Sequence, residues 1–172
     1  MAGVNSEQQR AELLEVTGLR FAVEPHVAAD GTMWISAEHE RLPELLAFLR
    51  HNGFAHCSAI SVTDWPEDGE FELTYHLWSY EDKILVTVKS RIDREEATAA
   101  SVISLWGPSA GIHERELHEL FGVSFEGNPD LAPLFLEDWE GPPPFRKDFD
   151  WRAYVREAFY EEGNSREQSY WD

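Results

Sequence analysis

Residues 114–149 of the chain read ERELHELFGVSFEGNPDLAPLFLEDWEGPPPFRKDF. The stretch begins with a short helical pattern and then loses every helix or strand period, while glycine, proline and paired charges recur along it. It nevertheless keeps four large apolar residues, Phe135, Trp139, Phe145 and Phe149. A free loop does not need such residues together, so we expect this segment to lie against another surface.

Two helical patterns come earlier in the chain. Residues 6–16 have apolar positions at helical spacing, with Ser6 placed to cap the N-terminus and Gly18 placed to end the helix. A second helix is predicted over residues 42–51, and Gly53 suits its end. We expect its apolar face to lie in the core; that face consists of Leu42, Leu45, Leu46 and Leu49.

Alternating apolar and polar residues, with turn signals between them, predict five extended segments. They span residues 21–28, 32–35, 56–63, 71–77 and 84–89. The first two flank Asp30-Gly31, which is a hairpin signal, and the last three indicate an antiparallel meander. In the third segment the alternation places Ser58, Ile60 and Val62 on one face.

Helical patterns return after the meander. One helix is predicted over residues 95–105, and Gly107-Pro108-Ser109 breaks it. The helix that carries residues 114–120 is predicted to begin near Gly111.

This order of elements predicts the α+β fold class, with a mainly antiparallel sheet and helices packed on one of its faces. An extended, irregular C-terminal arm would follow. The predicted domain boundaries are 1–124 for the α+β head and 125–172 for the arm, which we expect to dock on a partner.

Composition limits the possible partners. The 172 residues carry a formal net charge of -19, so neither nucleic-acid phosphates nor an anionic membrane surface is an expected partner. No apolar run approaches the roughly 20 residues that span a bilayer. The N-terminus lacks the basic and apolar regions of a secretory signal. The single Cys57 excludes a cysteine-based iron–sulfur or metal site and fits a reducing cytoplasm.

His113 and His118, beside Glu114, prompt a comparison with a helical zinc site. A zinc-protease helix needs histidines at positions i and i+4, whereas these two are separated by about 140° around a helix. They cannot chelate one ion from one regular helix, so surface or interface histidines are the preferred interpretation.

Other catalytic motifs are absent from the sequence. It has no nucleophile elbow, no Walker loop and no dinucleotide-binding glycine pattern. Many acids are available as general acid and base, but nothing places two of them across a cleft. A free-standing hydrolase that uses a carboxylate pair is therefore an alternative without a named site.

Two charged groups have ordinary explanations. Arg115 and Glu119 share a helix face, where an ion pair contributes only about 0.3–0.5 kcal/mol. Residues 146–148, Arg146-Lys147-Asp148, form the only compact basic island of the predicted arm, and alone they would indicate a solvated turn.

Four linked submotifs favour a different interpretation. In order they are Glu114-Arg115-Glu116, Asn128-Pro129-Asp130-Leu131, Asp138-Trp139-Glu140-Gly141 and Arg146-Lys147-Asp148-Phe149. Over about a fifth of the chain, this series resembles the thirty-kilodalton (NuoC-type) subunit of respiratory complex I, including related subunits of energy-converting membrane-bound hydrogenases. Asn128 stands where that family usually has His, His118 stands where it has an aromatic residue, and the run Pro142-Pro143-Pro144 also differs. These departures indicate a divergent branch.

The resemblance implies an accessory subunit with an α/β head and an extended arm. Its partners would be a large forty-nine-kilodalton-type (hydrogenase-like) subunit and iron–sulfur subunits, on the cytoplasmic side of the membrane and peripheral to it. It would carry no cofactor, and the iron–sulfur clusters, with a nickel–iron centre in a hydrogenase, would lie in the partners. The candidate partner-binding residues are Glu114, Arg115, Glu116, Asp130, Asp138, Trp139, Arg146, Lys147, Asp148 and Phe149.

Overall fold

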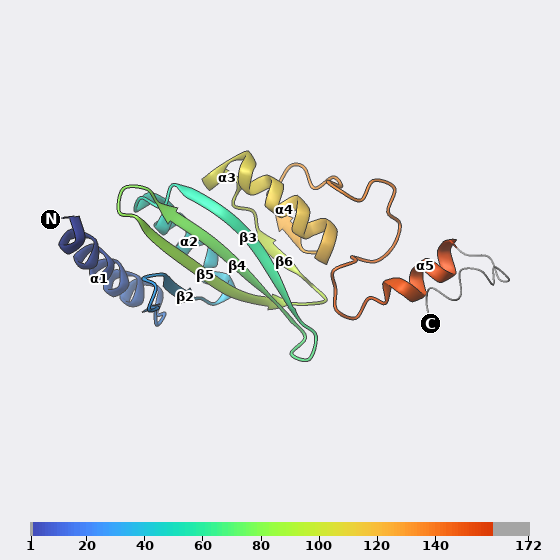
Figure 1. Ribbon diagram of the computed structural model, residues 1–172, viewed down its shortest axis with the longest axis horizontal. Coiled ribbons are helices and arrows are strands. Elements are labelled where there is room, and N and C mark those ends of the chain that lie inside the picture. Colours follow the sequence, from blue (N-terminus) through green and yellow to red (C-terminus); the bar gives the residue numbers. More distant parts are fainter. Residues whose placement is uncertain (1, 160–172) are drawn as a thin grey trace.

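The computed structural model describes residues 2–159. Their elements follow in the order α1 (Ala2–Phe21), β1 (His26–Val27), β2 (Met33–Ser36), the 3-10 helix η1 (His39–Arg41), α2 (Leu42–His51), β3 (His56–Trp65), β4 (Glu70–Ser79), β5 (Ile84–Asp93), β6 (Thr98–Ala100), α3 (Ile103–Trp106), α4 (Pro108–Phe121), β7 (Ser124–Glu126) and α5 (Trp151–Phe159). Figure 1 shows a central sheet, with α1 at one end of the molecule and α5 at the other.

Five strands form one sheet in the order β1-β2-β5-β4-β3. The β3–β4 and β4–β5 pairs and the short β1–β2 hairpin are antiparallel, whereas β2 runs parallel to β5. The predicted α+β class with a mainly antiparallel sheet is thus confirmed, and so is the meander. The parallel β2–β5 pair joins segments far apart in the chain, so no local turn signal could have indicated it.

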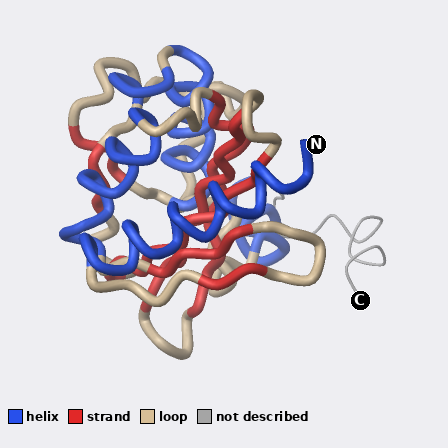
Figure 2. The backbone as a smooth tube through the Cα atoms, turned by 90° about the vertical axis from the view of Figure 1, so that its left-hand side faces the viewer, coloured by secondary structure: helices blue, strands red, loops and turns tan. Residues whose placement is uncertain are grey.

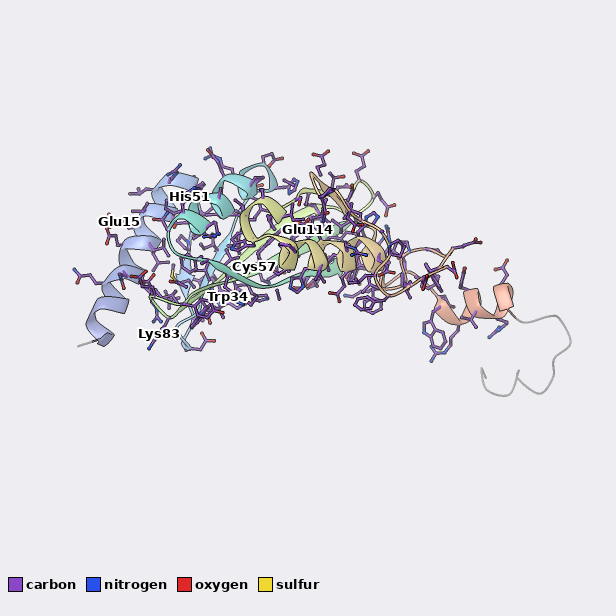
Figure 3. All side chains as sticks on the ribbon, turned by 90° about the horizontal axis from the view of Figure 1, so that it is seen from above. Glu15, Trp34, His51, Cys57, Lys83 and Glu114 are labelled. Carbon is purple, nitrogen blue, oxygen red and sulfur yellow. The ribbon has the colours of Figure 1, made fainter. Side chains whose placement is uncertain are left out.

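One face of the sheet forms the core. Leu73, Tyr75 and Leu77 alternate along β4 with no exposed surface, and the last two are aligned with Val88 and Val86 of β5. Burial of such a face is the main favourable term in folding. Helices α1 and α2 lie on this side of the sheet: Figure 3 shows Glu15 of α1 and His51 of α2 across the sheet from Trp34 of β2.

Helix α2 begins and ends where the sequence predicted. Its buried residues are the expected Leu42, Leu45, Leu46 and Leu49. The ring of Phe48, on the same helix, lies 5.5 Å from that of Phe21 at the end of α1. Figure 2, viewed from the end of the molecule where α1 lies, shows this first helix running across the width of that end.

The predicted first helix, residues 6–16, is too short. The observed α1 continues past Gly18 because Thr17 and Phe21 are buried and extend its contact with the core. Gly18 serves a close approach instead of a helix end, since a Cβ there would lie 3.3 Å from the carbonyl oxygen of Val23. Tertiary packing therefore outweighs the local stop signal.

Two strand predictions also need correction. The extended segment predicted over residues 21–28 shrinks to β1, because α1 takes its first residue and Ala22 then adopts a left-handed conformation with φ 54°. In β3 a register shift between Cys57 and Ala59 turns Cys57 into the core and leaves Ser58 exposed, so Ser58 does not share a face with Ile60. A β-bulge of this kind breaks the two-residue alternation from which the face was predicted.

The helix predicted over residues 95–105 is wrong. Asp93 first accepts a hydrogen bond of 2.8 Å from the backbone N–H of Glu95, which makes a turn. The chain then forms β6, in which buried Ala99 is paired in parallel with buried Phe125 of β7, and only α3 is helical. A long-range pairing that buries two side chains overrides the helical propensity of this segment.

Helix α4 also begins earlier than predicted. Its first residue is Pro108 instead of a residue near Gly111, because Gly107 adopts a positive φ of 70° and proline is favoured in the first helical turn. Gly122 ends the helix in the left-handed conformation, with φ 82°.

The chain after β7 contains the stretch that opened the sequence analysis. The predicted boundary between residues 124 and 125 falls inside β7, whose Phe125 is buried. Residues 127–150, called the C-terminal segment below, contain no helix or strand, and α5 then follows within the region predicted to be irregular. Residues 160–172 of the predicted arm lie outside the described residues.

Candidate functional site

Glu114 of α4 joins three parts of the chain. This residue has no exposed surface. Its Oε1 atom accepts a hydrogen bond from the backbone N–H of Val102 (2.6 Å), and its Oε2 atom accepts from Ser101 Oγ (2.7 Å) and Asn128 Nδ2 (2.8 Å). One buried carboxylate thus fixes the residues before α3, α4 itself and the start of the C-terminal segment. In this chain Glu114 can influence a partner surface only through the segments that it orders.

Arg115 follows Glu114 directly on α4, and Glu119 lies about one helical turn further on; both bind the backbone of the C-terminal segment. Arg115 donates to the carbonyl oxygens of Ala132 (3.0 Å) and Pro133 (3.1 Å), and it lies 3.6 Å from the carboxylate of Asp130. The carboxylate of Glu119 accepts from the backbone N–H groups of Leu134, Phe135 and Leu136. These two side chains share a helix face and could have formed an ion pair with each other, but they hold consecutive residues of an irregular segment instead. Backbone groups without secondary structure thereby gain partners.

The C-terminal end of α4 makes a further contact. The backbone N–H of Phe145 donates to the carbonyl oxygen of Leu120 (2.9 Å). The Phe145 ring meets that of Phe121 edge to face at 5.8 Å, and Phe121 meets buried Phe71 of β4 in the same way at 6.0 Å. An aromatic series therefore runs from the C-terminal segment to the sheet core.

Beyond the end of the sheet, Arg94 joins two carboxylates. The Arg94 guanidinium donates to Asp64 Oδ1 and Oδ2 (2.7 and 3.1 Å) and to Asp148 Oδ1 and Oδ2 (2.6 and 3.0 Å). Asp64 lies near the end of β3 and Asp148 belongs to the C-terminal segment, so the three residues, called the clamp below, fasten that segment to the sheet. The side chains of Arg94 and Asp64 are only 6% and 1% exposed, whereas that of Asp148 is 56% exposed.

The clamp stabilises the ionised form of all three groups. Hydrogen bonds to Asp64 and then to Asp148 raise the pKa of Arg94. Burial opposes ionisation of Asp64, but hydrogen bonds from Arg94 and from the Lys147 backbone N–H outweigh it and lower the Asp64 pKa. The hydrogen bond from Arg94 lowers the pKa of Asp148. The clamp therefore stays charged at neutral pH.

Arg146 and Lys147 extend this cluster. Arg146 forms an ion pair with Glu95 at 2.7 Å, and the backbone N–H of Lys147 donates to Asp64 Oδ2 at 2.7 Å. The Lys147 ammonium lies 5.5 Å from the ring centre of Trp65. The basic island is thus an ordered part of the contact between the C-terminal segment and the sheet, not a solvated turn.

Trp139 forms the centre of a separate aromatic cluster. Its ring lies 6.0 Å from that of Phe149 and 5.0 Å from that of Tyr154 in α5, and its indole N–H donates to the Pro142 carbonyl oxygen at 3.0 Å. A Cβ at Gly141 would lie 2.6 Å from the Trp139 ring, so only glycine fits there.

The predicted partner-binding residues therefore fall into three groups. Arg115 and Asp130 lie close together beside α4, and Glu114 of the same helix bonds Asn128 near them. Arg146, Lys147 and Asp148 lie at the sheet end, and Trp139 and Phe149 meet near α5. Glu116 is half-buried on α4, and Asp138 is exposed with a positive φ of 64°, each apart from these groups. Phe135 and Phe145 leave 65% and 59% of their surfaces exposed.

Sequence reasoning missed Asp64, Arg94 and Glu119. Nothing in the pattern links Asp64 or Arg94 to residue 148, because their contact depends on the fold. A weak signal was present, since Asp64 is the one acid at a core-facing position of β3, and an acid so placed needs a buried partner.

The single cysteine of the chain, Cys57, lies in the core. Cys57 is buried, and burial raises the pKa of its thiol to about 12, which keeps it protonated. Within residues 2–159 no group of three or more His, Cys, Asp or Glu side chains is arranged to hold a metal ion. In the same range no helix is long and apolar enough to cross a bilayer.

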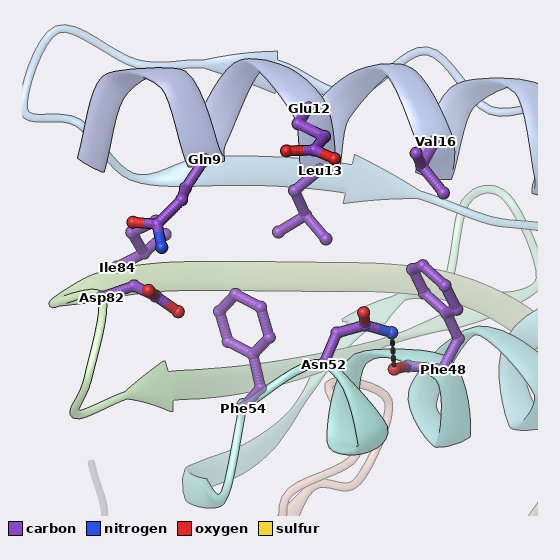
Figure 4. Close-up of a pocket in the computed structure, with 9 residues that line it drawn as sticks. All are labelled: Gln9, Glu12, Leu13, Val16, Phe48, Asn52, Phe54, Asp82 and Ile84. Carbon is purple, nitrogen blue, oxygen red and sulfur yellow. Dashed lines mark hydrogen bonds between the residues drawn. The ribbon is translucent and has the colours of Figure 1, made fainter. Parts of the chain in front are cut away.

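A pocket of about 290 Å³ lies between α1 and α2 (Figure 4). Leu13, Phe48 and Phe54 supply much of its apolar wall, and two acids, Glu12 and Asp82, also line it. Glu12 is exposed, and the Asp82 carboxylate accepts a hydrogen bond from Ser79 Oγ at 2.9 Å. These two acids do not form the buried pair that a hydrolase would use.

The fold and contacts define a small α+β domain whose irregular C-terminal segment is fastened along one helix and one sheet end. A family model described as the respiratory-chain NADH dehydrogenase 30 kDa subunit matches residues 35–155, well over half of the chain. The chain belongs to this family, as its four submotifs indicated.

Named relatives agree with this assignment. The chain is 33% identical over 115 residues to the C subunit of the F(420)H(2) dehydrogenase of Methanosarcina mazei, which covers 66% of this chain and 72% of that protein. It is 35% identical over 139 residues to a C subunit of the NADH-quinone oxidoreductase of Rhizobium meliloti (77% and 74%). It is 38% identical over 97 residues to the corresponding NADH-quinone oxidoreductase protein of Moorella thermoacetica (56% and 65%). Proteins of this kind are subunits of larger complexes, so partner subunits are implied.

Two solved structures are similar as well. A chain of the membrane-bound sulfane sulfur reductase, an archaeal respiratory membrane complex, superposes with a TM-score of 0.79 at 29% identity, over 91% of this chain and 94% of that one. The trypsin-resistant fragment (1-134) of Nqo5 superposes with a TM-score of 0.62 at 29% identity, over 70% and 98%. The family therefore extends to respiratory membrane complexes of different kinds.

Proposed function

We propose that this chain is a non-catalytic accessory subunit of the peripheral arm of a complex I-like, membrane-attached oxidoreductase. It braces a large forty-nine-kilodalton-type subunit and positions iron–sulfur subunits for electron transfer. The complex is of the NADH:quinone oxidoreductase kind or of the energy-converting nickel–iron hydrogenase kind. The clusters belong to the partners, and this chain lies on the cytoplasmic side, peripheral to the membrane.

The observation that carries the proposal is the fastening of the C-terminal segment. Arg115, Glu119 and Arg94 use side-chain charge to order an irregular segment along the head. Ordering such a segment costs conformational entropy, and the ring of Phe135, which is 65% exposed, gains little from it within this chain. A pre-ordered surface with exposed aromatic residues lowers the cost of binding a partner.

The test is purification through a tag on this chain from membranes of the source organism. The expected result is a complex that contains a hydrogenase-like large subunit and iron–sulfur proteins, while the chain produced alone holds no stoichiometric iron, nickel, zinc or flavin. A monomer from the native source that hydrolyses a substrate by itself would contradict the proposal. No contact in the described structure favours that hydrolase alternative.

A further inference from the structure

The sheet has a short open edge where β2 ends. The last β2–β5 pair is Ser36 with Lys89, and β5 continues to Asp93. Figure 1 shows β2 beside β5. Within residues 2–159, no strand pairs with this last part of β5 on the β2 side.

The direction of the free backbone groups follows from the observed hydrogen bonds. The Lys89 carbonyl oxygen accepts from Ala37 N–H, so Lys89 faces the β2 side. Arg94 N–H donates to the Gly69 carbonyl oxygen, so even-numbered residues face β4. Alternation then directs the N–H and C=O groups of Arg91 and Asp93 to the open edge, where they lack a ladder partner.

A groove of about 530 Å³ opens along the same edge. The end of α1, the turn after β2 and strands β4 and β5 line it. Ser90 is 3% exposed, and its hydroxyl, which lacks a hydrogen-bond partner in the described structure, belongs to this lining. A buried hydroxyl without a hydrogen-bond partner costs free energy. The groove therefore holds a polar side chain that lacks a hydrogen-bond partner, next to strand backbone that lacks a ladder partner.

The charges of the groove indicate what kind of peptide would fit. Lys89 pairs with Glu72 at 2.7 Å, and Arg91 pairs with Glu70 at 2.6 Å. Its other charged residues are one acid and one base, Glu38 and Arg41. In a chain of net charge -19, this lining is neutral, which suits an uncharged segment better than an acidic or basic one.

We propose that this edge receives a short, extended, uncharged segment of a neighbouring subunit, which continues the sheet beyond β2 through Arg91 and Asp93. A polar side chain of that segment would bond the Ser90 hydroxyl. Addition of a peptide to an exposed sheet edge is a recurring mode of recognition. This site is separate from the C-terminal segment. The identity of its occupant, a neighbouring subunit, rests on the proposed function.

Amide hydrogen exchange of the tagged native complex and of the isolated chain tests the proposal. In the isolated chain the amides of Arg91 and Asp93 should exchange rapidly, while those of Ser90 and Ile92, bonded to β4, should be protected and serve as internal controls. In the complex all four should be protected. Rapid exchange of Arg91 and Asp93 in the complex would overturn the proposal. So would their concentration-dependent protection in the isolated chain with dimer formation, because the occupant would then be a second copy.

A matched pair of variants separates the backbone from the side chain. Arg91→Pro removes the outward N–H at a position where an edge strand tolerates proline, and Arg91→Ala removes only the side chain and its ion pairs with Asp68, Glu70 and Glu72. We expect Arg91→Pro to weaken association with the complex about tenfold more than Arg91→Ala does, with both isolated chains folded by circular dichroism, because only the proline variant loses the backbone donor. Equal association of the two variants would refute the edge site while leaving the C-terminal segment as the docking element.

Discussion

Removal of Arg94 tests the clamp most sharply. Arg94→Met keeps much of the apolar stem but leaves Asp64, with only 1% of its side chain exposed, as a buried charge without its partner. Breaking a buried pair from one side costs about 3–5 kcal/mol. For a chain of this size that free energy corresponds to a fall in melting temperature of about 10 °C.

The control replaces the other end of the clamp. Asp148→Asn removes a carboxylate that is 56% exposed, where solvent screens the interaction, so the expected loss is about 1 kcal/mol or less. Urea unfolding of the isolated chain, followed by circular dichroism, measures both values. If Arg94→Met unfolds at the same urea concentration as the parent, or if Asp148→Asn costs as much as Arg94→Met, the clamp is not organised around a buried Asp64–Arg94 pair.

The remaining predictions concern the pH dependence of stability, the buried residues Glu114 and Leu46, and the reactivity of Cys57. The pKa values of Asp64 and Asp148 are lowered in the folded chain. Their contribution to the stability of the fold should therefore be complete above about pH 5 and should decline as the pH falls below about 4. Equal pH dependence of unfolding in the parent and in Arg94→Met would contradict this. Glu114→Gln should cost about 1–3 kcal/mol in urea unfolding, because an amide NH₂ replaces an oxygen that accepts buried hydrogen bonds, and an unchanged midpoint would count against that role. Leu46→Asp should abolish the cooperative thermal transition, because an unpaired charge in the core costs several kcal/mol, and a variant that melts like the parent would show that this face of α2 is not core. Cys57, with its raised pKa of about 12, should resist iodoacetamide at pH 8 until urea unfolds the chain, and rapid labelling of the native chain would disprove its burial.

The sequence predicted those parts of the fold that local patterns determine. The leucine face of α2 and the alternation along β4 each reflect one periodic surface that meets one core, and both are confirmed. The helix prediction for residues 95–105 was wrong because part of this segment pairs with β7, which lies further along the chain. The pairing of Ala99 with Phe125 outweighs the helical propensity of the segment. The predicted face of β3 was wrong for a related reason. The bulge inserts one extra residue, which reverses the alternation, and the composition gives no sign of it.

The candidate site likewise contains residues that the sequence singled out and contacts that it could not predict. The family submotifs drew attention to Arg115 and to residues 146–148, but they could not show what these residues contact. Their contacts include Asp64 and Arg94, which lie at the ends of β3 and β5 and approach each other only after the sheet has formed. Contacts between an irregular segment and a sheet end depend on tertiary structure, so a local pattern cannot supply them.

The most direct test of the bracing role uses the C-terminal segment itself. Trp139→Ala, Arg146→Ala and Phe135→Ala should each release the chain from its complex while leaving the head folded. Phe135 is the sharpest of the three, because its ring is 65% exposed and its replacement disturbs little inside the chain. Exposed Tyr80, in the turn between β4 and β5, supplies the matched control Tyr80→Ala.

The measurement is recovery of the large subunit with each tagged variant from native membranes, paired with circular dichroism of the isolated chain. The account predicts that the three segment variants lose the large subunit, that Tyr80→Ala retains it, and that all four isolated chains keep the spectrum of the parent. Truncating an interface hot spot typically costs about 2 kcal/mol or more, which is enough to reduce recovery visibly. Full recovery of the large subunit and full activity of the complex with all three segment variants would contradict the account.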